Sequence, residues 1–147
     1  MIVVTGAAGF IGSNLVRALN QRGRTDLLLV DDLTDGQKFR NLADCDFLDF
    51  ADKGDLLERI AARELADVEA IFHQGACSNT MEWNGRTMLA DNYEYSKALY
   101  AFAAAREIPL IYASSAAVYG MGPVFREDPA LEKPLNLYAR SKALFDR

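Results

Sequence analysis

A tyrosine and a lysine near the end of the chain have the types and spacing needed for proton transfer. Tyr138 and Lys142 stand four positions apart, so on a helix they share one face. A neighbouring ammonium group favours the phenolate and lowers the pKa of a tyrosine from about 10 toward neutral pH. We therefore predict that Tyr138 takes a proton from a substrate alcohol as hydride leaves, and then returns it. Ser115 follows an apolar run, and its hydroxyl is placed to support the same oxygen. The alternative is a capping serine and an ordinary helical tyrosine.

A glycine-rich turn near the N-terminus predicts a site for a pyrophosphate. The apolar run 1–5 leads into Gly6, Gly9 and Gly12 and then into an amphipathic stretch. Such a turn passes close to phosphates because side chains are absent, and the helix that follows offers free N–H donors to negative charge. This order of strand, turn and helix indicates dinucleotide binding.

Charged residues after the second apolar run fit the adenosine end of the same ligand. Asp31 ends that run, where a carboxylate accepts hydrogen bonds from ribose hydroxyls. Lys38 and Lys53 are suited to a 2′-phosphate, which favours NADP and leaves NAD as the other possibility. The alternative is a solvated aspartate and two surface lysines.

The elements that must position these residues follow an alternating pattern. Apolar runs alternate with helical periodicity, which predicts an α/β fold with a Rossmann-like, doubly wound parallel sheet and helices on both faces. We expect one domain over 1–147. Strands are expected at 2–5, 27–30, 45–47, 68–72 and 109–113, and helices at 11–22, 55–65, 88–107 and from 137 onward, with Gly23 capping the first helix and loops around 35–36 and 123–134.

Composition excludes several classes of protein. The chain has 147 residues, of which 50% are hydrophobic, and a net charge of −5, which disfavours a nucleic-acid partner. No apolar run approaches the roughly 20 residues of a membrane span. Cys45 and Cys77 are too few for a disulfide scaffold and do not resemble a metal site. We expect a cytoplasmic protein that binds neither nucleic acid, membrane nor metal.

Taken together, these motifs resemble the extended short-chain dehydrogenase/reductase superfamily. The shared motifs are TGxxGFIG, the acid after the second strand, SSAAVYG and YxxxK. Within that superfamily, the stretches 31–39, 71–78 and 132–138 are similar to the ADP-glyceromanno-heptose 6-epimerase family. The likeness runs in register along essentially the whole chain.

The resemblance implies a nucleotide-sugar epimerase. Members of that family invert C6″ of ADP-D-glycero-D-manno-heptose for the lipopolysaccharide inner core, using tightly held NADP to oxidise the carbon and reduce it again. The resemblance also implies an ADP-heptose substrate and a homo-oligomer for the full-length protein.

Site residues carry over from the family by position. The catalytic set would be Ser115, Tyr138 and Lys142. The cofactor-binding set would be Gly6, Gly9, Phe10, Ile11 and Gly12 at the pyrophosphate turn, Asp31, Asp32, Lys38 and Lys53 at the adenosine end, Gln74, Gly75, Ala76, Cys77 and Ser78 after the fourth strand, and Asn92, Tyr138 and Lys142 on the helices that follow.

The chain also departs from the family pattern. The family usually has asparagine where Asp32 stands and glutamate where Gln74 stands, and a second acid at Asp32 disfavours a 2′-phosphate because like charges repel. The family's second catalytic base and its sugar-binding segments lie beyond Arg147. We therefore expect the chain to be the front portion of a longer enzyme and to be incapable of full epimerisation by itself.

Three other functions are alternatives to this one. Sugar dehydratases of the superfamily carry an Asp-Glu pair after the active-site hydroxyl, where this chain has Ala116 and Ala117, which cannot move protons. A UDP-hexose 4-epimerase has a similar active-site string and stays open. A dinucleotide-binding module without catalysis also stays open.

Overall fold

The computed structural model describes all 147 residues, which divide into two compact units. Unit 1 contains Met1–Gly75 and Tyr100–Tyr112, and unit 2 contains Ala76–Leu99 and Ala113–Arg147. The glycine-rich turn belongs to unit 1, whereas the YxxxK pair belongs to unit 2. The expectation of one domain over 1–147 stays a prediction.

Unit 1 is organised by a five-stranded parallel sheet. Its strands are β1 (Ile2–Thr5), β2 (Leu27–Asp31), β3 (Asp49–Asp52), β4 (Ala70–His73) and β5 (Leu110–Tyr112), in the order β3-β2-β1-β4-β5. All four pairings are parallel. The order reverses direction between β1 and β4, and ligands of open parallel sheets bind at the carboxyl ends of the strands beside such a reversal. The predicted Rossmann-like parallel sheet is confirmed.

Register divides the apolar side chains of the sheet between its two faces. Val4 pairs with Leu29 on one side and with Phe72 on the other, and these residues share a core with Val16 from the first helix. Because side chains alternate along a strand, Val3 and its partners lie on the opposite face. Every residue of β1 and β2 is buried, as expected for strands covered on both faces.

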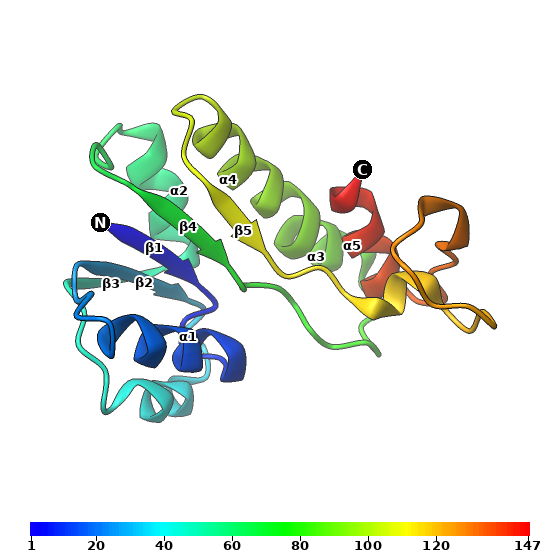
Figure 1. The fold of residues 1–147 in the computed structure, drawn as a ribbon, viewed down its shortest axis with the longest axis horizontal. Helices are drawn as coiled ribbons and strands as arrows, with labels where there is room; N and C mark the ends of the chain where they lie inside the picture. Colours follow the sequence, from blue (N-terminus) through cyan, green and yellow to red (C-terminus); the bar gives the residue numbers. More distant parts are fainter. The chain divides into compact units, whose positions relative to one another are not determined.

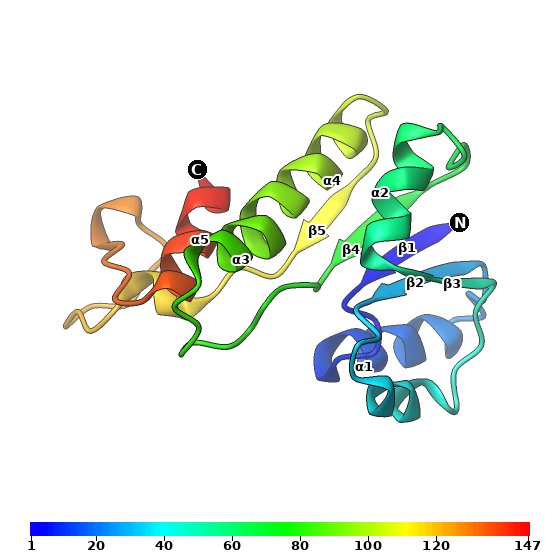
Figure 2. The ribbon, with the colours of Figure 1, turned by 180° about the vertical axis from the view of Figure 1, so that it is seen from behind.

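Helices cover both faces of this sheet. Helix α1 (Phe10–Asn20) and helix α2 (Lys53–Ala61) lie on opposite faces (Figures 1 and 2). Between β2 and β3 the chain forms a 3₁₀ helix, Gly36–Leu42, capped by the Asp35 side chain. The buried Leu42 adds this short helix to the core beneath α1.

Unit 2 is helical. Helix α3 (Gly85–Leu89) continues through a π-helical stretch, Ala90–Glu94, into helix α4 (Tyr95–Ala104), whose first five residues belong to this unit. Helix α5 (Leu137–Asp146) contacts the π-helical stretch and the 3₁₀ helix Ala116–Tyr119. A further 3₁₀ turn, Pro129–Leu131, interrupts the proline-bearing loop.

Several predicted boundaries were wrong. The third strand lies at Asp49–Asp52 rather than at 45–47, because its backbone pairs with β2 although its sequence, DFAD, has little apolar signal. Asp52 accepts a hydrogen bond from the Gly54 backbone N–H, so α2 begins two residues earlier than expected. The predicted helix 88–107 begins at Gly85 and ends at Ala104.

Two predicted features near turns also differ. The loop expected around residues 35–36 ends at Asp35, because a 3₁₀ helix begins at Gly36. Gly23 does not cap α1 directly: Gln21 is the cap, and Gly23 follows with a φ of +75°, a left-handed conformation that glycine adopts without strain. No helix is long and apolar enough to span a membrane.

Truncating a side chain at the centre of the sheet tests this packing. Leu29 is fully buried, so Leu29→Ala should lower the free energy of unfolding by about 2–5 kcal/mol through lost burial and a cavity. Leu48, which is 69% exposed in the same unit, supplies the control. Leu48→Ala should change the free energy of unfolding by about 0.5 kcal/mol or less. Urea denaturation of the full-length protein measures both, and equal effects would contradict the assigned register.

Candidate functional site

The glycine turn brings backbone segments together more closely than a side chain permits. Gly6 has a φ of +65°, and a Cβ on it would lie 2.6 Å from the Gly75 nitrogen. A Cβ on Gly12 would overlap the Gly6 carbonyl oxygen. Both positions therefore require glycine, and the turn stays compact between β1 and α1.

The start of α1 leaves backbone donors free for a ligand. Its cap is Gly9, which offers no side chain to the first-turn N–H groups. Phe10 and Ile11 follow, and they are 84% and 60% exposed. Uncapped N–H groups and the helix dipole together attract anions. This end of α1 fits a phosphate group.

Asp31 holds the turn in place. Its carboxylate accepts hydrogen bonds from the backbone N–H groups of Ala8 at 2.7 Å and Asp32 at 2.8 Å, and from the Lys38 ammonium at 3.1 Å. Asp31 is only 7% exposed. A carboxylate has about four acceptor positions, so most of this one is used within the protein. The second charge pair is more accessible to a ligand.

That second pair joins Asp32 to Lys53. The Lys53 ammonium lies 3.0 Å from an Asp32 carboxylate oxygen. Thr34 donates to the other oxygen through its hydroxyl and its backbone N–H. These bonds from Thr34, followed by the one from Lys53, hold the pKa of the Asp32 carboxyl well below its usual range. Two lysines and two carboxylates thus pair at the carboxyl end of β2.

The segment after β4 closes against β1. The backbone N–H of Gln74 donates to the Thr5 carbonyl, and that of Gly75 donates to the Thr5 hydroxyl. His73 Nδ1 hydrogen-bonds with the same hydroxyl at 2.6 Å. The only histidine is therefore buried and partnered beneath the glycine turn, which is a structural role.

In unit 2, α5 presents Tyr138 and Lys142. Asn136 caps the helix by accepting from the Ala139 N–H at 2.8 Å. Lys142 is 5% exposed, and its ammonium donates to the Ala113 carbonyl at 2.8 Å. Burial lowers the pKa of Lys142, and nearby Asp146 opposes that shift. A buried lysine held by one neutral carbonyl keeps donor capacity for a further partner.

Ser115 lies at the end of the apolar run, where the chain turns. Its hydroxyl oxygen accepts from the Ala117 N–H at 3.2 Å and so caps the 3₁₀ helix. That bond uses a lone pair and leaves the hydroxyl proton able to donate. The capping alternative and the catalytic prediction are therefore compatible. The adjacent Ser114 instead donates to Asp146 at 2.6 Å.

A buried amide links α5 to the loop after β4. Asn92 is 1% exposed in the π-helical stretch. Its side chain accepts from the Cys77 N–H at 2.7 Å and donates to the Cys77 carbonyl and the Ser141 hydroxyl, each at 3.0 Å. Ser141 in turn donates to the Tyr138 carbonyl at 2.7 Å. Asn92 therefore orients both the Cys77 loop and the first turn of α5.

The structure groups the sequence-predicted residues by unit. Unit 1 contains the turn glycines, Phe10, Ile11, the two aspartates, the two lysines, Gln74 and Gly75, and unit 2 contains Ala76, Cys77, Ser78, Asn92, Ser115, Tyr138 and Lys142. Sequence reasoning missed Ser141, although it lies inside the YxxxK motif, and Asn41, which donates to the Ala8 carbonyl at 2.8 Å. No local signal marks Asn41.

Comparison with known proteins places this arrangement in a family. The profile of the NAD dependent epimerase/dehydratase family matches residues 2–147. The chain belongs to this family. An epimerase/dehydratase needs both a dinucleotide-binding turn and a proton-transfer group, and the two units carry candidates for each.

Individual relatives agree with the family. The chain is 58% identical over 99% of its length to the ADP-L-glycero-D-manno-heptose-6-epimerase of Pseudomonas paraeruginosa, but spans only 44% of that relative. It is similar to the crystal structure of the Helicobacter pylori ADP-L-glycero-D-manno-heptose-6-epimerase, with a TM-score of 0.86, 30% identity, and coverage of 99% of this chain and 48% of that one. MoeE5 in complex with UDP-glucuronic acid and NAD matches with a TM-score of 0.77 and 29% identity, covering 99% and 47% of the two chains.

The buried lysine makes stability depend on pH in a defined direction. Because the pKa of Lys142 is lower in the folded than in the unfolded chain, the folded state loses its proton first as pH rises. The contribution of Lys142 to the free energy of unfolding should therefore rise with pH, from the pKa of Lys142 in the folded chain up to its pKa of about 10.5 in the unfolded chain. Lys142→Met should remove that rise, whereas Lys133→Met, at an exposed lysine of the same unit, should retain it. Urea denaturation of the full-length protein between pH 8 and 10.5 provides the measurement, and parallel curves for all three proteins would contradict the assignment.

Proposed function

We propose that the full-length protein is a nucleotide-sugar epimerase that inverts C6″ of ADP-D-glycero-D-manno-heptose to give the L-glycero form. The observation that carries this proposal is the 58% identity, over 99% of this chain, to a relative named ADP-L-glycero-D-manno-heptose-6-epimerase. The site supports it, because Ser115, Tyr138 and Lys142 belong to one compact unit. The product serves the lipopolysaccharide inner core, and the enzyme is proposed to be a cytoplasmic homo-oligomer.

The residues of unit 1 fit a nicotinamide dinucleotide. Gly6 and Gly12 keep the turn free of side chains, and the uncapped start of α1 provides donors for the pyrophosphate. Lys38 and Lys53, which are 38% and 39% exposed, supply positive charge for a 2′-phosphate. Each is already paired with one carboxylate, so a doubly charged phosphate competes with Asp31 and Asp32 for them. We propose that NADP is preferred and that NAD also binds.

Proton transfer is assigned to unit 2. When bound, the dinucleotide supplies the acceptor and donor of hydride. Tyr138, in its phenolate form, takes the proton from the substrate hydroxyl and, as the phenol so formed, returns it at the end of the cycle. Ser115 donates a hydrogen bond to the same substrate oxygen through its free proton. Lys142, whose ammonium is held near α5 by the Ala113 carbonyl, stabilises the phenolate and binds the ribose.

The cofactor preference can be tested at the accessible lysine. Lys53→Ala should weaken NADP binding about tenfold or more, because a hydrogen bond to a charged group is lost, and should change NAD binding little. Isothermal titration of the full-length protein with both dinucleotides measures this, with NAD as the internal control. Tighter binding of NAD than NADP by the unaltered protein would overturn the preference.

The proton-transfer role can be tested at Tyr138. In the full-length protein, Tyr138→Phe should lower turnover of ADP-D-glycero-D-manno-heptose by at least about a hundredfold while cofactor binding stays nearly intact. Tyr100→Phe, at a tyrosine that is 59% exposed, should retain full activity. A Tyr138→Phe variant as active as the unaltered enzyme would remove the phenol from the mechanism.

A UDP-hexose 4-epimerase is the second candidate. It is favoured by the match at 29% identity to a protein solved with UDP-glucuronic acid and NAD. Incubation of the full-length enzyme with ADP-heptose and with UDP-hexoses discriminates between the two by which sugar is epimerised. A dehydratase is disfavoured because Ala116 and Ala117, which follow Ser115 in the 3₁₀ helix, carry no acid or base.

A further inference from the structure

The carbonyl of the glycine turn is held by a side chain from the 3₁₀ helix Gly36–Leu42. Asn41 donates from its amide nitrogen to the Ala8 carbonyl oxygen at 2.8 Å. The next N–H, that of Gly9, donates to the Gly6 carbonyl at 3.1 Å. Both ends of the peptide group between Ala8 and Gly9 are thus fixed. Because this peptide leads directly into α1, its orientation sets the direction of the uncapped N–H groups that follow.

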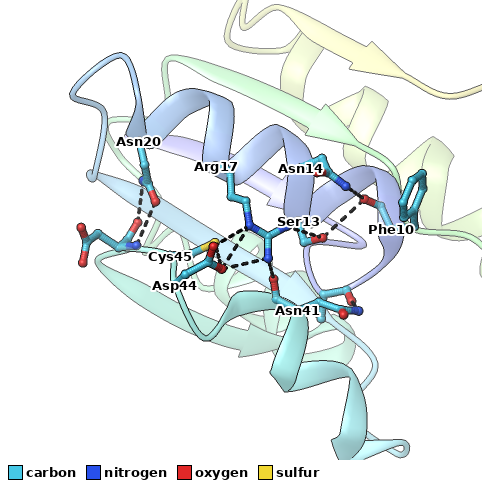
Figure 3. Close-up of polar contacts among 10 residues, drawn as sticks. Phe10, Ser13, Asn14, Arg17, Asn20, Asn41, Asp44 and Cys45 are labelled. Atoms are coloured by element: carbon cyan, nitrogen blue, oxygen red, sulfur yellow. Dashed lines mark hydrogen bonds and ion pairs between the residues drawn. The ribbon is translucent and has the colours of Figure 1, made fainter.

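Asn41 is itself held by a charged side chain of α1. Arg17 donates to the Asn41 backbone carbonyl at 2.7 Å. The same guanidinium binds both carboxylate oxygens of Asp44, at 2.9 Å from Nε and 2.8 Å from Nη2 (Figure 3). A two-point contact of this kind fixes the plane of the guanidinium.

The contacts of Arg17 with Asp44 and Asn41 fix the geometry of this region and add little to the stability of the fold. Asp44 is 64% exposed and Arg17 33% exposed, and ion pairs at such exposures add little to stability. The hydrogen bond from Arg17 lowers the pKa of the Asp44 carboxyl, and an aspartate with its usual pKa of about 4 is already charged at neutral pH. The pair therefore anchors Asn41 across the physiological range.

We propose that Asn41 is a positioning residue for the pyrophosphate of a dinucleotide, acting through the Ala8–Gly9 peptide. This inference rests on the proposed dinucleotide binding of unit 1. The residue does not touch the ligand in this role. Its removal leaves the positive charges of the adenosine end in place and loosens only the turn.

The experiment compares two asparagines that tie α1 to its surroundings. Asn41→Ala removes the bond to the turn, whereas Asn20→Ala, the control, removes bonds to the Arg24 and Asp46 carbonyls at the other end of α1. Isothermal titration of the full-length protein uses NAD, NADP and adenosine 2′-monophosphate, which has no pyrophosphate. Asn41→Ala should weaken the binding of NAD and of NADP by about tenfold each. The affinity for adenosine 2′-monophosphate should change by less than about twofold. Asn20→Ala should change the affinity for each of the three ligands by less than about twofold.

A second variant keeps the test independent of folding. Asn41→Asp preserves the shape of the side chain but cannot donate to the Ala8 carbonyl, so it should weaken both dinucleotides at least as much as Asn41→Ala. Unchanged dinucleotide affinity in either variant, equal losses in Asn20→Ala, or an equal loss for adenosine 2′-monophosphate would overturn the inference. Failure of the unaltered protein to bind NAD or NADP would instead refute the proposed function, and the inference with it.

Discussion

The hydrogen bond from the Ala8 N–H to the Asp31 carboxylate connects the fold of unit 1 to its chemistry. At 2.7 Å it joins the last residue of β2 to the turn that leaves β1. A buried carboxylate is costly unless it is paired, and here Lys38 and the Asp32 N–H complete its partners. The parallel pairing of β1 with β2 and the close approach at Gly6 make this bond possible. The glycine turn is therefore fixed to the carboxyl ends of β1 and β2.

The two units hold their polar side chains in place with different kinds of interaction. Unit 1 pairs charged groups, the buried Asp31 with Lys38 and the part-exposed Asp32 with Lys53. Unit 2 uses neutral groups inside the protein, with the Asn92 amide and the Ser141 hydroxyl bonding to backbone. Such fully partnered buried groups favour a single arrangement, because breaking any bond leaves a polar atom without a partner.

Sequence reasoning predicted the features that depend on local patterns. β1, the glycine turn, α1 and α5 follow from apolar periodicity and glycine placement, and Lys142 shares α5 with Tyr138 as its spacing required. It failed where tertiary pairing decides the structure. β3 is a strand because its backbone pairs in parallel with β2. Its sequence, DFAD, has no apolar alternation strong enough to predict a strand. Asn41 was missed for the same reason, since its partner, Ala8, lies 33 residues away.

The π-helical stretch Ala90–Glu94 has a consequence for the side chains around it. Met88, Asn92 and Ser96 are all buried and succeed one another at intervals of four, a spacing that drifts by about 40° per step around an α-helix. The wider turn takes up much of that drift, so a thioether, an amide and a hydroxyl stay on one inward side. The π-helical turn thus decides which side chains of this helix face the interior of unit 2. Losing one residue from the stretch would restore ordinary winding and rotate the amide away from Cys77, with the composition of the helix almost unaltered.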